Sequence, residues 1–456
     1  MYKEQEQRLG SENGNHDKKD VMLQIIKAKV HRRLLEILDL NEARRIPIEQ
    51  LHVECANRVN ALLNEHKYPL SGPEKEQLLR EVMDEIFGFG PLEEFFRDPL
   101  ISDILVNGPH QIYIEREGKL ELTDASFMND DHLLRVIRRI GTNVGRRIDE
   151  STPMLDARLP DGSRVNAIIP PLALGGPALS IRRFGVNPID TDRLLELDSL
   201  TEDMAFFLQV CVQCKMNILI SGGTGTGKTT LLNVLSRWIP PGERVLTIED
   251  AAELQLQRDH VVRLETRPPN IEGQGEITQR ELLRNSLRMR PDRIIIGEVR
   301  GDETLDMLQA MNTGHEGSMT TVHANNPRDG LRRIENMMSM AGITYPVRAM
   351  REQISSALDV LVHVDRLTGG RRKISKIVEI TGMESDTICL HDIFQFSQTG
   401  VDDTGNAYGH FEACGVRPHL LGRIQAEGVE IPQDLFRRRI LERASLADKK
   451  EVFNKE

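Results

Sequence analysis

One segment constrains the fold of this chain more than any other: the sequence GGTGTGKT at residues 222–229. An apolar run at residues 217–221 precedes it, and a run typical of a helix begins at Thr230. The segment matches the pattern GxxxxGK[ST], which binds phosphate when it lies between a strand and a helix. A chance match in an irregular loop is the alternative, but the strand–loop–helix context makes it unfavourable. The sequence therefore predicts a phosphate-binding loop within an α/β domain.

From about residue 202 onward, short apolar runs alternate with helical patterns. Strands that alternate with helices predict a parallel sheet. The expected strands are residues 217–221, 244–248, 260–264, 293–296 and 318–322. After about residue 384 the pattern changes, and we expect short strands and a basic terminal helix that contains Arg437, Arg438 and Arg439.

The part of the chain before residue 202 follows other patterns. Apolar residues at helical spacing predict three amphipathic helices before residue 90, and the third begins at Ser71 with Glu74 in a capping box. The first of these helices is basic, and we expect it to pack against protein rather than on a membrane surface. Short strands joined by Asn107-Gly108, with one helix, then predict a compact α+β domain. The expected division is a disordered arm at 1–19, a helical bundle at 20–90, an α+β N-terminal domain at 91–186, a linker at 187–200, a nucleotide-binding domain at 201–384 and a C-terminal extension at 385–456.

The glycine-rich segment has a direct chemical interpretation. Glycines let the backbone wrap around phosphates, and the exposed N–H groups and the helix N-terminus supply positive potential. We expect Lys228 to reach the β- and γ-phosphates and Thr229 to offer its hydroxyl to Mg²⁺. The expected nucleotide-binding residues are Gly222, Gly223, Thr224, Gly225, Thr226, Gly227, Lys228, Thr229 and Thr230.

Three further polar side chains follow apolar strands, where parallel sheets place their ligands. Glu249 is expected to orient and deprotonate the attacking water, although acids also occur at ordinary strand-end turns. Glu298 follows residues 293–296 and is expected to manage Mg²⁺ and its waters, whereas Asp292 lies at the other end of that strand and is discounted. His323 is expected to sense the γ-phosphate or the water, although a lone histidine is often structural.

Composition excludes several classes of protein. The net charge is −11 and aromatic residues make up 4% of the 456 residues, which argues against a nucleic-acid-binding protein. The five cysteines include one CxxC, Cys211 to Cys214, which we expect to be ordinary packing residues on a helix because no second pair completes a zinc site. The N-terminus lacks a secretory signal, and no apolar run is long enough to span a membrane. We therefore expect a cytoplasmic location, with any membrane contact made through partners.

Four blocks in order resemble the secretion ATPase superfamily of type II and type IV systems. They are a Walker A motif at 222–229, an Asp box at 246–253, an atypical Walker B motif at 294–301 and a His box at 314–325. The chain most resembles the Tad/Flp pilus ATPase branch, of the CpaF type, in segments such as Asp161–Asn166 and Ser180–Phe184. It lacks the four-cysteine zinc element of the type II members. The resemblance implies a RecA-like P-loop domain that binds ATP with Mg²⁺ and follows the α+β domain and the helical extension.

The resemblance also implies a mode of action. Members form homo-hexameric rings, and arginines of the N-terminal domain reach the phosphates; the matching positions here are Arg164 and Arg182, for which surface salt bridges are the alternative. The implied function is an ATPase motor that powers assembly, with retraction as a further role, of a Tad/Flp pilus through inner-membrane platform proteins. A type IV secretion ATPase that moves protein or DNA stays open. So does a helicase or a nucleotide-switched scaffold.

Overall fold

The computed structural model describes residues 48–442 except 66–67, 69, 117–118, 184–188, 268, 270–273 and 343–344, together with Ile26, Lys29, Val30 and Arg33. It contains two compact units, Met1–Val186 and Asn187–Glu456, and each is considered by itself. Within the described part of the chain, no helix has the length and apolar character that a membrane span requires. The expected disordered arm lies outside the described residues.

The first unit begins with a small helical cluster. Its helices α4 (Ile48–Glu65) and α5 (Gly72–Phe87) bear out the second and third predicted helices. Ser71 caps α5, and both its N–H and its hydroxyl donate to Glu74, as the capping box predicts. Ile26 and Val30 are helical and pack with the apolar face of α4, whereas most of the first predicted helix lies outside the described residues.

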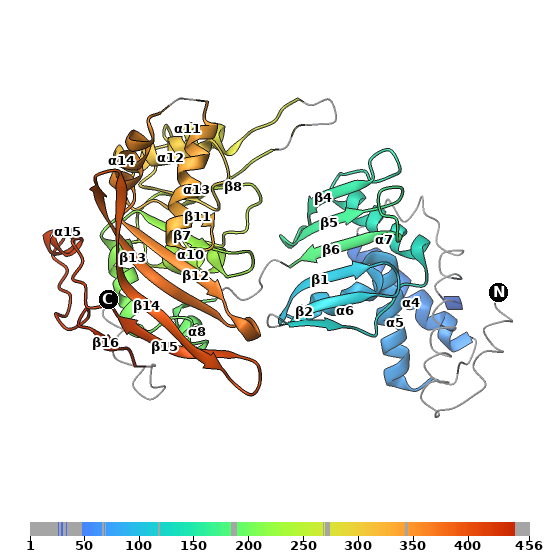
Figure 1. Ribbon diagram of the computed structural model, residues 1–456. Helices are drawn as coiled ribbons and strands as arrows, with labels where there is room; N and C mark the ends of the chain where they lie inside the picture. Colours follow the sequence, from blue (N-terminus) through green and yellow to red (C-terminus); the bar gives the residue numbers. More distant parts are fainter. Residues whose placement is uncertain are drawn as a thin grey trace. The chain divides into compact units, whose positions relative to one another are not determined.

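The rest of the first unit is a six-stranded antiparallel sheet with helix α7 (Asp130–Asn143) packed on one face (Figure 1). The expected α+β pattern is therefore present. The strand order is β3-β2-β1-β6-β5-β4. The elements are η1 (Gly90–Leu92), α6 (Glu93–Arg97), β1 (Ile101–Asn107), β2 (Ile112–Arg116), β3 (Lys119–Leu122), β4 (Met154–Arg158), β5 (Arg164–Ile168) and β6 (Ala178–Arg182).

The second unit is built on a ten-stranded sheet with the order β16-β15-β14-β13-β12-β7-β11-β10-β8-β9. The strands from β9 to β12 in this order run parallel, as the alternation of strands and helices predicts. All five predicted strands are present within one residue at each end: β7 (Ile218–Gly222), β8 (Val245–Glu249), β9 (Val261–Glu265), β10 (Arg293–Ile296) and β11 (Met319–His323).

Helices cover both faces of the parallel strands, because successive side chains of a strand point to opposite faces. On β7, Ile218 and Ile220 enter one apolar cluster, and Leu219 enters the other. Full burial of such a side chain contributes about 1.5–3 kcal/mol. The first cluster includes the helices α8 (Thr191–Glu196), α9 (Glu202–Gln213) and α10 (Lys228–Arg237); the second includes α11 (Gln279–Ser286), α12 (Glu303–Asn312), α13 (Pro327–Met340) and α14 (Val347–Ala357).

Two details of this unit bear on the sequence predictions. The expected linker contains α8, whose Leu194 and Leu195 are buried in the first apolar cluster. Cys211 lies on α9 and Cys214 caps it, and both are buried free thiols. Burial raises the pKa of each thiol. The interpretation of the CxxC as packing residues is therefore confirmed.

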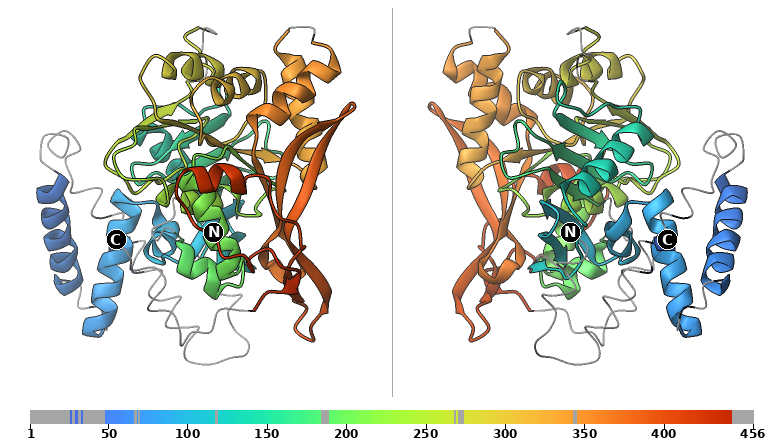
Figure 2. Two further views of the ribbon diagram at one scale, coloured as in Figure 1. Left: turned by 90° about the vertical axis from the view of Figure 1, so that its left-hand side faces the viewer. Right: turned by 90° about the vertical axis from the view of Figure 1, so that its right-hand side faces the viewer.

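After residue 384 the expectation of short strands is correct for the last two strands only, and the expectation of a basic helix containing Arg437, Arg438 and Arg439 is wrong. The long strands β13 (Arg372–Glu384) and β14 (Thr387–Val401) extend the sheet beyond β12 (Val360–Arg366) as an orange-to-red ribbon (Figure 2). The remaining elements are η2 (Thr368–Gly370), β15 (Ala407–Ala413), α15 (Leu421–Ala426) and β16 (Arg439–Ile440), so Arg439 is in a strand. Bulges shift the pairing register of β13 and β14, and each bulge interrupts the alternation by which long strands are recognised.

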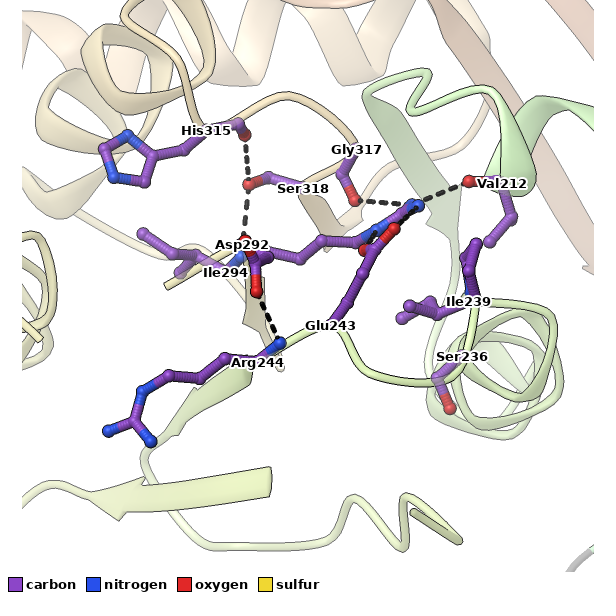
Figure 3. Close-up of polar contacts among 12 residues, drawn as sticks. Val212, Ser236, Ile239, Glu243, Arg244, Asp292, Ile294, His315, Gly317 and Ser318 are labelled. Atoms are coloured by element: carbon purple, nitrogen blue, oxygen red, sulfur yellow. Dashed lines mark hydrogen bonds and ion pairs between the residues drawn. The ribbon is translucent and has the colours of Figure 1, made fainter. Parts of the chain in front are cut away.

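A buried arginine, Arg293, ties the amino ends of the parallel strands together, and Figure 3 labels its partners Glu243, Val212 and Gly317. Arg293, which is 0% exposed, forms an ion pair with Glu243 and donates to the carbonyl oxygens of Val212, at 2.7 Å, and Gly317, at 3.4 Å. These partners come from the end of α9 and from the loops before β8 and β11. Asp292 accepts a hydrogen bond from the backbone N–H of Arg244 at 2.7 Å. It therefore lies at the amino end of the sheet, as predicted when it was discounted as a site residue.

Replacing Arg293 with methionine should remove the ion-pair partner of Glu243 and the side-chain donor to the carbonyl groups of Val212 and Gly317. We expect the free energy of unfolding of this unit to fall by about 3–5 kcal/mol, measured by urea titration. Arg348→Met is the control, because the Arg348 side chain is 68% exposed and its pair with Glu352 contributes at most about 0.5 kcal/mol. Equal losses in the two variants would contradict the structural role of Arg293.

Candidate nucleotide-binding site

The glycine-rich loop joins β7 to α10 and needs its glycines for conformation and space. Gly225 and Gly227 have φ angles of +70° and +97°, a region that other residues rarely adopt. A Cβ atom on Gly222 would lie 2.4 Å from the carbonyl oxygen of Val364 on β12. The strand–loop–helix context predicted for this segment is therefore present, and α10 begins directly at Lys228.

Lys228 folds back over this loop. Its Nζ donates to the carbonyl oxygen of Gly223 at 2.8 Å and lies 3.4 Å from Nδ1 of His323. The side chain is buried, and burial lowers the pKa of its ammonium group. A buried cation inside a loop of glycine backbone is the arrangement that a polyphosphate fits, because the anion would supply the missing counter-charge.

The carboxyl ends of β10 and β11 bring two more predicted residues to Lys228. Glu298, just beyond β10, lies with its Oε1 3.0 Å from Nε2 of His323 and accepts a hydrogen bond through Oε2 from Arg300 at 2.7 Å. His323 ends β11 and pairs in register with Gly222, where the loop begins. Burial lowers the pKa of His323 despite the nearby carboxylate. The structure thus joins Lys228, His323 and Glu298 in one line of contacts.

Glu249 ends β8 and is 3% exposed. Its Oε2 accepts hydrogen bonds from the backbone N–H groups of Glu253 and Leu254 at 2.7 and 2.9 Å. Within the described part of the chain, its Oε1 has no hydrogen-bond partner. A Cβ atom on Gly297 would lie 2.9 Å from Cγ of Glu249, so the carboxyl group lies beside the chain that leads into Glu298. Burial raises the pKa of Glu249 to about 7.

Arg300 was not among the predicted site residues, although it is two residues after Glu298. Arg300 bridges Glu298 and Asp250, with a distance of 3.4 Å to Oδ2 of Asp250. The hydrogen bond to Glu298 raises the pKa of this guanidinium. The sequence signal for Arg300 was its position two residues after Glu298 in the same block. Its second contact, Asp250, follows β8 and is seen only in the structure.

The hydroxyl and carboxylate groups present fit a magnesium ion held jointly with phosphate. Thr229 lies in the first turn of α10, and Glu298 offers a carboxylate beyond β10. Mg²⁺ usually binds through one or two protein oxygens, waters and phosphate oxygens rather than a protein cage. Among the described residues, no group of three or more His, Cys, Asp or Glu side chains could hold a metal alone.

Arg164 and Arg182 lie in the first unit, on neighbouring strands, directly opposite each other. Both are exposed, and each pairs with an aspartate of the adjoining strand: Arg164 with Asp156 at 2.9 Å and Arg182 with Asp103 at 3.2 Å. The salt bridges named as the alternative therefore exist. Because both pairs are exposed, each contributes little to stability.

The raised pKa of Glu249 predicts a pH-dependent cost to stability. Between pH 4.5 and about 7 the folded state holds this proton while the unfolded state releases it, so the free energy of unfolding falls as pH rises. Above about pH 7 the full cost, roughly 3 kcal/mol, is present. Glu249→Gln keeps the two backbone hydrogen bonds without the charge. We expect it to be more stable than the wild type at pH 8 and nearly equal at pH 4.5, in urea titrations.

Glu265 provides a matched control, because it pairs in register with Glu249 but is exposed on the edge strand β9. Glu265→Gln should leave the free energy of unfolding nearly unchanged, because its side chain is exposed. A stability difference between Glu249→Gln and the wild type that stays constant from pH 4.5 to 8 would show that Glu249 does not titrate in this range.

Comparisons with known proteins show which family this chain is similar to. Residues 85–400 match the family described as "Type II/IV secretion system protein". The chain is 35% identical over 339 residues to the putative conjugal transfer protein Rv3659c of Mycobacterium tuberculosis, which covers 70% of this chain and 96% of that protein. It is 33% identical over 293 residues to the conjugal transfer protein TrbB of Rhizobium radiobacter, which covers 63% and 86%. The solved structure of the VirB11 ATPase from the Brucella suis type IV secretion system is 29% identical over 64% of this chain and 97% of that one, with a TM-score of 0.35. The chain therefore belongs to the type II/IV secretion system protein family.

Proposed function

We propose that this chain is a motor that hydrolyses ATP and uses the energy to move parts of a secretion or pilus machine. The observation that carries the proposal is the line of contacts from the loop through Lys228 and His323 to Glu298. A cation in a phosphate-binding loop, a histidine and a carboxylate meet where parallel sheets bind their ligands. Membership of the family supports nucleotide binding.

In this proposal Lys228 leaves the carbonyl of Gly223 and contacts the β- and γ-phosphates. Thr229 and Glu298 would hold Mg²⁺, which would neutralise charge on the phosphate. His323 contacts both Lys228 and Glu298, so movement of either one changes its surroundings. His323 thereby acts as the sensor that passes the state of the γ-phosphate to β11.

Glu249 is the proposed general base. Its Oε2 is held by two backbone N–H groups, and its Oε1 is left to accept a hydrogen bond from the attacking water. A base whose pKa is near the working pH accepts a proton most effectively, and burial raises the pKa of Glu249 to about 7. Hydrolysis should therefore slow as pH falls below about 7, because the carboxylate becomes protonated.

Arg164 and Arg182 complete the proposed chemistry. Their side chains emerge from opposed positions of β5 and β6, so two guanidinium groups are available to one phosphate group. The cost of leaving Asp156 and Asp103 is small, since these ion pairs are exposed. Arginines that stabilise the transferred phosphoryl group raise the rate by about 10³–10⁵. A homo-hexameric ring is the proposed assembly.

Two substitutions test the proposed chemistry. Lys228→Ala should abolish ATP turnover, because the loop loses its only lysine. Glu249→Gln should bind ATP normally but hydrolyse it about 10²–10⁴-fold more slowly. Turnover is measured by phosphate release, with the mass of the particle measured in the same buffer. Glu265→Gln, on the adjoining strand, is the control and should match the wild type.

Normal turnover in Lys228→Ala would refute the proposal. Normal turnover in Glu249→Gln would move the role of base to Glu298. Hydrolysis strongly stimulated by single-stranded DNA, with affinity that falls steeply with salt, would instead favour a helicase.

The proposed motor could power either of two kinds of machine. The helical N-terminal extension and the C-terminal segments Asp392–Phe394 and Gly415–Pro418, which resemble the Tad/Flp branch, favour a Tad/Flp pilus with inner-membrane platform proteins. The identity to conjugal transfer proteins, at 33–35%, favours a type IV secretion system that moves DNA or protein at least as well. The chemistry is common to both machines, so the partner decides between them.

Deleting the gene in its native cell separates the two machines. Loss of surface pili with unchanged DNA transfer is expected for a pilus motor, and loss of DNA transfer with intact pili is expected for a conjugation motor. Complementation with Glu249→Gln, which should fail, shows that hydrolysis is needed. A deletion strain that keeps both its pili and its DNA transfer would contradict both assignments.

A further inference from the structure

The hairpin formed by β12 and β13 extends beyond the sheet beside the phosphate-binding loop. Gly222 pairs in register with Val364, and at this point β7 turns into the loop. β12 continues for two more residues to Arg366, and the chain returns through η2 to Arg372 at the start of β13. Arg366 and Arg372 pair in register with each other, so the hairpin carries two arginines past the end of β7.

Both arginines lie against the loop. Arg372 Nε donates to the carbonyl oxygen of Gly225 at 3.0 Å, and its Cδ would lie 3.5 Å from a Cβ atom on Gly227. Nη1 of Arg366 would lie 3.6 Å from a Cβ atom on Gly225. The glycines therefore leave room for these side chains as well as for the loop conformation.

The hairpin is also fixed to the strand that carries the loop. Ser221, the residue before Gly222, lies with its Oγ 2.8 Å from Nδ1 of His363 on β12, and His363 is 2% exposed. On the other arm, Ser375 Oγ donates to Asp365 Oδ2 at 2.5 Å. Because these contacts are at the base of the hairpin, Arg366 and Arg372 are held in position relative to the loop.

The order of the strands shows which part of a nucleotide these arginines face. β7 lies between β11 and β12. Lys228, His323 and Glu298 form the line of contacts on the β11 side, where the terminal phosphates are expected. The hairpin lies on the β12 side. A nucleotide that places its γ-phosphate toward β11 directs its base and ribose toward β12.

We propose that Arg366 and Arg372 bind the nucleoside half of the nucleotide, with the guanidinium plane of Arg366 stacked on the base. This inference rests on the proposed function, because it concerns the same loop. A guanidinium group is flat, stays charged and stacks on aromatic faces, and a purine offers such a face. Arg372 braces Gly225 through its hydrogen bond and contacts the ribose side. The contact is the same for ATP and ADP, so it contributes to affinity and not to the rate of the chemical step.

The test compares nucleotides with inorganic tripolyphosphate, which has the phosphates but no nucleoside. Isothermal titration calorimetry on the full chain measures the binding of Mg·ATP, Mg·ADP and Mg·tripolyphosphate. Arg366→Ala should weaken the binding of ATP and of ADP by the same factor, about 3- to 30-fold, and leave the binding of tripolyphosphate unchanged. Arg366→Lys keeps the charge without the flat group, and it should weaken both nucleotides as well. Arg371→Ala is the control, because Arg371 is exposed on the same hairpin.

The other results are equally informative. An equal loss of affinity for tripolyphosphate in Arg366→Ala would mean that the arginine binds phosphate, and unchanged affinity for all three ligands would mean that it binds no part of the nucleotide; either result overturns the inference but not the proposed function. A wild-type chain that binds neither ATP nor tripolyphosphate would overturn the proposed function, and this inference with it. The melting temperature of each variant shows whether it is folded.

Discussion

The pairing register of the parallel strands determines where every chemical group of the second unit lies. Arg293 ties α9, β8 and β11 together at the amino end of the sheet, and hydrogen bonds between parallel strands carry that register to the opposite edge. There Glu249, Glu298 and His323 emerge from three neighbouring strands. A shift of one residue would turn each of these side chains to the other face of the sheet. The buried arginine therefore affects the site from the far end of the same strands.

At the site edge, unfavourable burial is concentrated on groups that a nucleotide would contact. Burial lowers the pKa of Lys228 and raises the pKa of Glu249, so each charged form costs free energy in the protein alone. Lys228 is stabilised by a carbonyl oxygen and by the neighbouring histidine, partners that phosphate oxygens can replace. Phosphate binding would therefore relieve the cost at Lys228. The cost at Glu249 explains why Glu249→Gln should gain stability while it loses turnover.

Much of this arrangement could be predicted from the sequence, because the relevant patterns are local. The loop at Gly222 to Thr229, the five parallel strands and the polar residues after them each show in a short stretch of chain. Ser71 with Glu74 predicted a helix start for the same reason. The long strands β13 and β14 could not be predicted, since bulges interrupt their alternation. Arg366 and Arg372 were missed because their contacts join segments far apart in the chain, and Arg300 was missed although its contact with Glu298 is local. The assigned roles, including those of Arg164 and Arg182, stay predictions.

The central claim is that the carboxyl edge of this sheet is built around the polyphosphate of a nucleotide. A crystal structure of the full chain with Mg²⁺ and a non-hydrolysable ATP analogue tests it most directly. We expect that Lys228 leaves the carbonyl of Gly223 for the β- and γ-phosphates, and that the terminal phosphate faces Glu298 and His323. A nucleotide bound elsewhere, or a Lys228 that keeps its contact with Gly223, would show that this edge is not a polyphosphate site.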